Sequence, residues 1–189
     1  VANLGDSRAV LCRGGKPVQI TDDHKPTRED EAARIRENGG HIIVSSRGLT
    51  RVAHNRVAAG IESSATADYK LGLSVSRAFG DRDFKAPHAL VSAEPEIRTI
   101  ELSKESDLFL ILGCDGVWDV LNNKEAVEVV AAHLALFDAK KAALALVEAA
   151  KERGSGDDLT VHVIVFQENK HRIAEIMEEL LEDDDDAKS

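Results

Sequence analysis

The sequence of 189 residues predicts an α+β domain built from antiparallel strands and amphipathic helices. Apolar segments at 9–11 and 18–20 flank a Gly-Gly pair, which favours the positive backbone angles of a tight hairpin. Residues 108–113 form a continuous apolar run, typical of a strand that is buried on both faces. Residues 124–137 and 139–152 are rich in Ala and Val and repeat their apolar positions about every 3.6 residues, which indicates two helices.

The rest of the first half is less regular. The acids at 29–31 would stabilise the positive end of a helix that continues to residue 36, and Asn-Gly-Gly at 38–40 ends it. Residues 41–44 are predicted to form a strand. Residues 45–70 carry scattered Ser, Gly, Ala and Asn without a clear period, so we interpret them as a loop-rich excursion.

The second half contains two further predicted strands and a terminal helix. The strands are expected at 97–102 and at 159–166, the latter after a Gly-Ser-Gly break at 154–156. Residues 170–182 place five apolar side chains on one stripe and predict a last, amphipathic helix. That helix is expected to cover its own domain, with docking on another protein as the alternative.

Composition excludes several classes of protein. Only two cysteines are present, which argues against a disulfide-rich scaffold and a cysteine-based zinc site and favours a reducing compartment. The longest apolar runs are far shorter than the roughly 18 residues that a membrane span requires. The net charge of −10 and 4% aromatic residues argue against electrostatic binding to DNA or RNA. Residues 170–189 hold eight acidic and three basic residues, so this tail carries half of the net charge.

The candidate chemistry lies in aspartates at two strand ends. Asp115 follows the buried strand, Asp119 lies one helical turn later, and Asp157 stands in the turn before the strand at 159–166. If that strand runs antiparallel beside 108–113, Asp115 and Asp157 converge at one edge of the sheet. Carboxylates in such a cluster suit a hard cation such as Mg²⁺ or Mn²⁺.

The residues alone leave structural explanations open for each of these aspartates. Asp115 alone is well explained as a helix N-cap and Asp157 as a turn residue, and from the pattern alone this structural interpretation is the stronger one. For Asp6, between two predicted strands, a turn acid paired with Arg8 is the simpler interpretation. Trp118 is expected to fill the core rather than to bind a ligand.

Six ordered motifs together resemble the metal-dependent Ser/Thr protein phosphatases of type 2C, over about residues 1–166. They are residues 1–9 (VANLGDSRA), 21–26 (TDDHKP), 31–35 (EAARI) with the Gly pair at 39–40, 73–81 (LSVSRAFGD), 110–120 (LILGCDGVWDV) and 154–161 (GSGDDLTV).

The resemblance implies part of a four-layer α-β-β-α sandwich, in which two antiparallel sheets are flanked by antiparallel helices. It also implies Mn²⁺ or Mg²⁺ as cofactor, with two or three ions in the complete domain. Asp115 and Asp157 match metal-binding aspartates of the family, and Asp6 and Asp119 match positions linked to an additional, weaker metal. A metal-activated water would then attack the phosphorus without a protein nucleophile.

Some family motifs have no counterpart in this chain. The phosphate-binding Arg, the Asp-Gly-His metal segment and the general-acid His are expected upstream. We therefore interpret residues 1–166 as the C-terminal part of a catalytic domain, and 167–189 as an amphipathic helix followed by an acidic tail. No catalytic residue besides the metal ligands is expected in this part.

The implied function is hydrolysis of phosphoserine and phosphothreonine in proteins, with this chain inactive when isolated. The alternative is a non-catalytic, phosphatase-like interaction module. Expected partners are a phosphorylated protein substrate and the missing N-terminal part of the domain, but neither nucleic acid nor a membrane. An intracellular location, cytoplasmic or nuclear, is expected.

Overall fold

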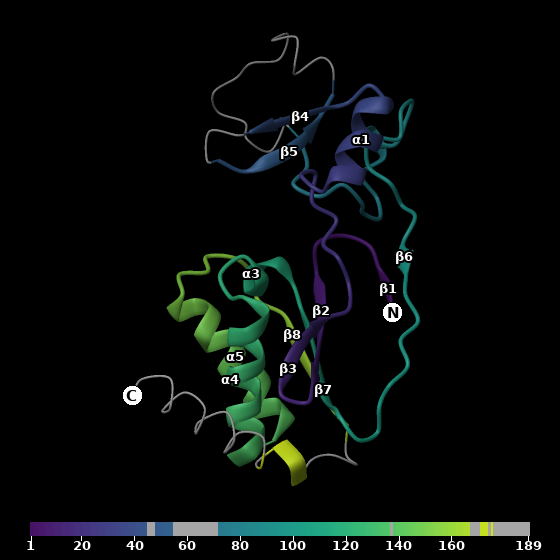
Figure 1. Ribbon diagram of the computed structural model, residues 1–189. Coiled ribbons are helices and arrows are strands. Elements are labelled where there is room, and N and C mark those ends of the chain that lie inside the picture. Colours follow the sequence, from purple (N-terminus) through teal and green to yellow (C-terminus); the bar gives the residue numbers. More distant parts are fainter. Residues whose placement is uncertain (45–47, 55–71, 137, 167–170, 174, 176–189) are drawn as a thin grey trace, which may run out of the picture. The chain divides into compact units, whose positions relative to one another are not determined.

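The computed structural model describes residues 1–44, 48–54, 72–136, 138–166, 171–173 and 175 (Figure 1). The chain divides into two compact units. The first, called the sheet unit, comprises Val1, Ser7–Asp22 and the residues from Arg98 onward. The second, called the α1 unit, comprises Ala2–Asp6 and Asp23–Ile97.

The sheet unit contains one antiparallel sheet of four strands in the order β3-β2-β7-β8. The strands are β2 (Arg8–Arg13), β3 (Lys16–Gln19), β7 (Asp107–Gly113) and β8 (Val161–Val165). The predicted hairpin is confirmed, because β2 and β3 pair across Gly14 and Gly15, whose φ angles are 54° and 76°.

The central strand β7 also has the predicted position. It pairs with β2 on one side and with β8 on the other. In the second pairing Gly113 lies opposite Val161, so the end of β7 and the start of β8 lie at the same edge of the sheet. This antiparallel pairing is the arrangement on which convergence of Asp115 and Asp157 depended.

Helices cover one face of this sheet (Figure 1). They are α3 (Asp115–Trp118), α4 (Asn123–Leu136) and α5 (Ala139–Glu152). Phe109 and Ile111 of β7 pack with Val130 of α4 and Leu146 of α5 in one fully buried cluster. Because both helices present an apolar stripe at helical spacing, the prediction from periodicity is confirmed to within one residue at the start of α4 and in full for α5.

The other face of the sheet carries a smaller apolar cluster. Ala9, Leu11 and Ile20 are buried there, with Leu110 and Leu112 packed against them. Ile164 of β8 keeps 46% of its surface exposed.

The α1 unit contains one helix, a turn of 3-10 helix and two short sheets in its described residues. Its core is formed by Ile35, Val52, Leu90 and Val91. The elements are β1 (Ala2–Asn3), α1 (Glu29–Glu37), β4 (His41–Val44), β5 (Thr50–Ala53), η2 (Arg82–Phe84) and β6 (Glu96–Ile97), with β1 paired to β6 and β4 paired to β5.

Two predictions in the less regular regions were wrong. The strand expected at 97–102 is reduced to β6. Ile97 and Leu102 are 74% and 57% exposed, and only Ile100 packs partly against the cluster of Ala9, Leu11 and Ile20. Inside the predicted loop 45–70, β5 pairs with β4, because Val52 is fully buried beside Ile42. Residues 55–71 lie outside the described residues.

The predicted terminal helix at 170–182 lies mostly outside the described residues. Residues 171–173 and 175 are helical, and Ile173 is buried in the core of the sheet unit. None of the helices in the described ranges combines the length and the apolar composition that a membrane span requires.

Candidate metal centre

Asp115 is the first residue of α3 and stands two positions after the end of β7. The extended residue Cys114 separates strand from helix, so the N-cap role falls to Cys114 rather than to Asp115. One carboxylate oxygen of Asp115 accepts the N–H of Gly116 at 2.9 Å. The buried strand and the short helix therefore fix the backbone of Asp115.

Asp157 lies in the turn between α5 and β8 and is exposed. One of its carboxylate oxygens accepts the N–H of Asp158 at 2.7 Å. The turn packs directly on the start of α3, since a Cβ placed on Gly116 would lie 3.2 Å from the Cβ of Asp157. Asp115 and Asp157 therefore stand on two segments in contact with each other.

Asp119 lies at the C-terminal end of α3, and its N–H donates to the backbone oxygen of Asp115 at 2.8 Å. Asp119 lines an open groove of about 490 Å³ together with Arg8 and Arg153. Asp119 thus follows Asp115 by one helical turn, as the sequence predicted.

Asp6 belongs to the α1 unit. Its carboxylate accepts a hydrogen bond from the ammonium group of Lys25 at 2.6 Å. Arg8, the partner suggested by the sequence, donates to the side chain of Asn123 and lies over the ring of Trp118. Trp118 itself is 6% exposed in the core, as expected.

The donor atoms of Asp115 and Asp157 suit a hard divalent cation, which prefers carboxylate oxygens and water. Within the described ranges, no group of three or more His, Cys, Asp or Glu side chains gathers in a metal-binding arrangement. The two aspartates therefore fit part of a metal site and would need further ligands or water to complete it.

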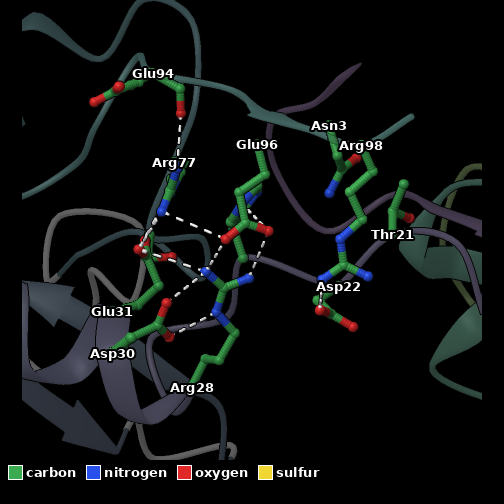
Figure 2. Close-up of polar contacts among 12 residues, drawn as sticks. Asn3, Thr21, Asp22, Arg28, Asp30, Glu31, Arg77, Glu94, Glu96 and Arg98 are labelled. Carbon is green, nitrogen blue, oxygen red and sulfur yellow. Dashed lines mark hydrogen bonds and ion pairs between the residues drawn. The ribbon is translucent and has the colours of Figure 1, made fainter. Parts of the chain in front are cut away.

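Sequence reasoning missed a buried charge network in the α1 unit (Figure 2). Glu31 on α1 is 1% exposed and accepts hydrogen bonds from Arg34 and Arg77. Burial raises the pKa of Glu31, but the hydrogen bonds from the two guanidinium groups outweigh it and bring the pKa to about 2.

Further charged residues lie around Glu31 and its two arginine partners. Arg28 binds Asp30 and Glu96, and its hydrogen bond lowers the pKa of Glu96 (Figure 2). His24 is fully buried near Glu96, and burial lowers the pKa of its imidazole. The acid-rich first turn of α1 was the only sequence signal for this network. The neighbouring residues do not show that, of its three acids, Glu31 is the buried one.

A sequence model of the family Protein phosphatase 2C matches residues 1–159 of this chain. The chain belongs to the protein phosphatase 2C family. The resemblance carried by the six sequence motifs is thereby confirmed.

Named relatives agree with this family. The chain is 41% identical over 175 residues to "Probable protein phosphatase 2C 59" of Oryza sativa subsp. japonica, which covers 93% of this chain and 46% of the relative. It is 37% identical over 171 residues to "Protein phosphatase 1A" of Homo sapiens, covering 87% of this chain and 39% of the relative. The chain thus spans less than half the length of these type 2C phosphatases.

Solved structures share the fold. A sex-determining protein of C. elegans superposes with a TM-score of 0.73 at 28% identity, covering 93% of this chain and 38% of that one. A serine-threonine phosphatase 2C of Toxoplasma gondii gives a TM-score of 0.69 at 26% identity, covering 88% of this chain and 54% of that one. The mixed α/β fold with antiparallel sheets, predicted from the sequence, is that of type 2C phosphatases.

Proposed function

We propose that this chain forms the C-terminal part of a type 2C phosphatase domain that hydrolyses phosphoserine and phosphothreonine in proteins. The observation that carries the proposal is the contact between the two segments that bear Asp115 and Asp157, on a chain that belongs to this family. Two carboxylates held close together repel each other unless a cation lies between them.

In this proposal Asp115 and Asp157 hold Mn²⁺ or Mg²⁺, and Asp119 contributes to an additional, weaker site. The bound ions would lower the pKa of a coordinated water and neutralise the phosphoryl oxygens. The aspartates hold their position through the rigid end of β7 and the turn before β8.

The phosphate-binding Arg, the Asp-Gly-His segment and the general-acid His would come from the part of the domain that the relatives have beyond this chain. Cys12 and Cys114 are free thiols, which supports an intracellular location, cytoplasmic or nuclear. The net charge of −10 argues against electrostatic binding to a nucleic acid.

The first test is hydrolysis by the purified 189-residue chain with Mn²⁺, using p-nitrophenyl phosphate and a phosphothreonine peptide. We expect no turnover above background. Metal-dependent hydrolysis by this chain would contradict the division of the active site between the two parts of the domain.

The second test uses the complete protein. Asp115→Asn and Asp157→Asn should each lower kcat/KM by about 100-fold or more, because a metal ligand is lost. Asp138→Asn is the matched control, since Asp138 caps α5 through the N–H of Lys141 and should leave turnover unchanged. Near-normal turnover in both site variants would remove the assignment of these two aspartates. A complete protein that shows no turnover even without substitutions would favour the non-catalytic interaction module.

A further inference from the structure

The turn that carries Asp157 is attached to the start of α3 by four hydrogen bonds. The hydroxyl of Ser155 donates to the backbone oxygen of Gly116 at 2.7 Å. The thiol of Cys114 donates to the backbone oxygen of Asp158 and accepts the N–H of Thr160, both at 3.2 Å. The backbone N–H of Cys114 donates to the oxygen of Thr160, also at 3.2 Å.

The two segments also touch without a side chain between them. A Cβ on Gly116 would lie 2.6 Å from the backbone oxygen of Asp158 and 3.1 Å from Cδ2 of Leu159. Real Cβ contacts do not reach 2.6 Å, so any side chain at Gly116 would push the turn away from α3. This glycine is therefore required by close approach of two backbones.

These contacts hold the chain both before and after Asp157. Ser155 anchors the turn two residues before Asp157, and the backbone oxygen of Asp158 anchors it one residue after. The N–H of Ser155 also donates to the oxygen of Ala150 at 3.0 Å, which ties the turn to the end of α5. An exposed turn is ordinarily free to move, whereas this one has its position fixed relative to Asp115.

We propose that Ser155 and Gly116 are positioning residues that set the separation of the Asp115 and Asp157 carboxylates for metal binding. The inference rests on the proposed function, because it takes these aspartates as the metal ligands. Residues that orient a metal ligand raise affinity because less order has to be imposed when the ion binds.

The hydroxyl is tested by titrating the complete protein with Mn²⁺ in a calorimeter. Ser155→Ala should weaken the apparent Mn²⁺ affinity by about 10-fold, and Ser155→Thr, which keeps the hydroxyl, should restore most of it. The matched control is Ser103→Ala, because its hydroxyl makes local hydrogen bonds at the opposite end of β7 and should leave the affinity unchanged.

The close approach is tested with a pair of glycine variants. Gly116→Ala should weaken the Mn²⁺ affinity by about 10-fold or more, because the added methyl group displaces the turn. Gly156→Ala is the control, because Gly156 directly precedes Asp157 but its added methyl group would meet no atom within 4 Å beyond its chain neighbours. This variant should change the affinity less than about two-fold. Thermal unfolding of each metal-free variant shows whether the fold is retained, and Ser155→Ala decides the question if Gly116→Ala does not fold.

The outcomes separate this inference from the proposed function. If Asp157→Asn weakens Mn²⁺ binding while Ser155→Ala and Gly116→Ala do not, the positioning role is overturned and the metal site stands. An equal loss of affinity in Gly156→Ala would also overturn it. If Asp157→Asn leaves Mn²⁺ binding unchanged, the metal site itself is overturned, and the positioning role with it.

Discussion

The carboxylate of Glu31 accepts two hydrogen bonds from the guanidinium of Arg77, the shorter at 2.8 Å, although the two residues are 46 positions apart. Arg34 on the same helix donates to the other oxygen at 2.9 Å. This arrangement connects α1 to the Ser-Arg-Ala segment at 76–78. The backbone N–H of Ala78 in turn donates to Ser92.

Glu31→Gln should destabilise the protein by about 2–3 kcal/mol, because it leaves two arginines facing a neutral group in a buried site. This loss of unfolding free energy is smaller than for a fully buried ion pair, since the side chains of Arg34 and Arg77 are 26% and 14% exposed. Urea unfolding at pH 7 measures it. Asp30→Asn on the same helix is the control and should cost less than about 1 kcal/mol, because Asp30 is 60% exposed. An equal loss in both variants would contradict a special role for Glu31.

The same residue predicts a pH dependence. The pKa of Glu31 is about 2 in the folded protein and near 4.5 in the unfolded chain, so the unfolded chain binds more protons between these values. Its contribution of about 3 kcal/mol is complete above pH ~4.5 and is lost as the pH falls toward ~2. The difference in unfolding free energy between wild type and Glu31→Gln should therefore narrow over this range. A constant difference between pH 5.5 and pH 3 would contradict the lowered pKa.

Gly113 and Trp118 support the position of Asp115 from the core. The indole N–H of Trp118 donates to the backbone oxygen of Gly113 at 2.8 Å, and a Cβ on Gly113 would lie 2.8 Å from the same nitrogen. Gly113→Ala should therefore cost about 1–3 kcal/mol through overpacking and should shift the fluorescence of Trp118. Gly156→Ala, with open space around it, should cost less than about 0.5 kcal/mol. Wild-type stability in Gly113→Ala would contradict this prediction, because it would show that the indole of Trp118 can move without loss of unfolding free energy.

Asp107 at the start of β7 offers a further test. Its side chain is 2% exposed, binds the guanidinium of Arg13 at 2.6 Å and accepts the N–H of Ser103 at 2.8 Å; the hydrogen bond from Arg13 lowers its pKa. Asp107→Asn should lower the unfolding free energy by about 1–2 kcal/mol, because a charge-assisted hydrogen bond is lost. Asp22→Asn removes an exposed ion pair with Arg98 and should cost at most about 1 kcal/mol. Thermal unfolding compares the two, and equal losses would contradict the importance of burial.

The parts of the fold that could be predicted are those with a local cause. The hairpin at Gly14 and Gly15 depends on the backbone freedom of adjacent glycines, and α5 depends on apolar residues at helical spacing. The strand β5 was missed because four residues with two adjacent buried positions, Val52 and Ala53, give too short a pattern. The strand expected at 97–102 was predicted from apolar residues that do not share one buried face, because Ile97 and Leu102 are exposed and only Ile100 packs against a cluster.

By itself, the sequence determined the family, the hairpin, central strand and two long helices of the sheet unit, and the placement of Asp115 and Asp157 at strand ends. It did so because turn chemistry, periodicity and motifs depend on residues that are close together in the sequence. Only the tertiary structure decided that Glu31 is the buried acid of its helix and that Ser155 and Gly116 meet. Glu31 and its partner Arg77 are 46 positions apart, and Ser155 and Gly116 are 39 apart. Only packing against the rest of the fold brings such residues together.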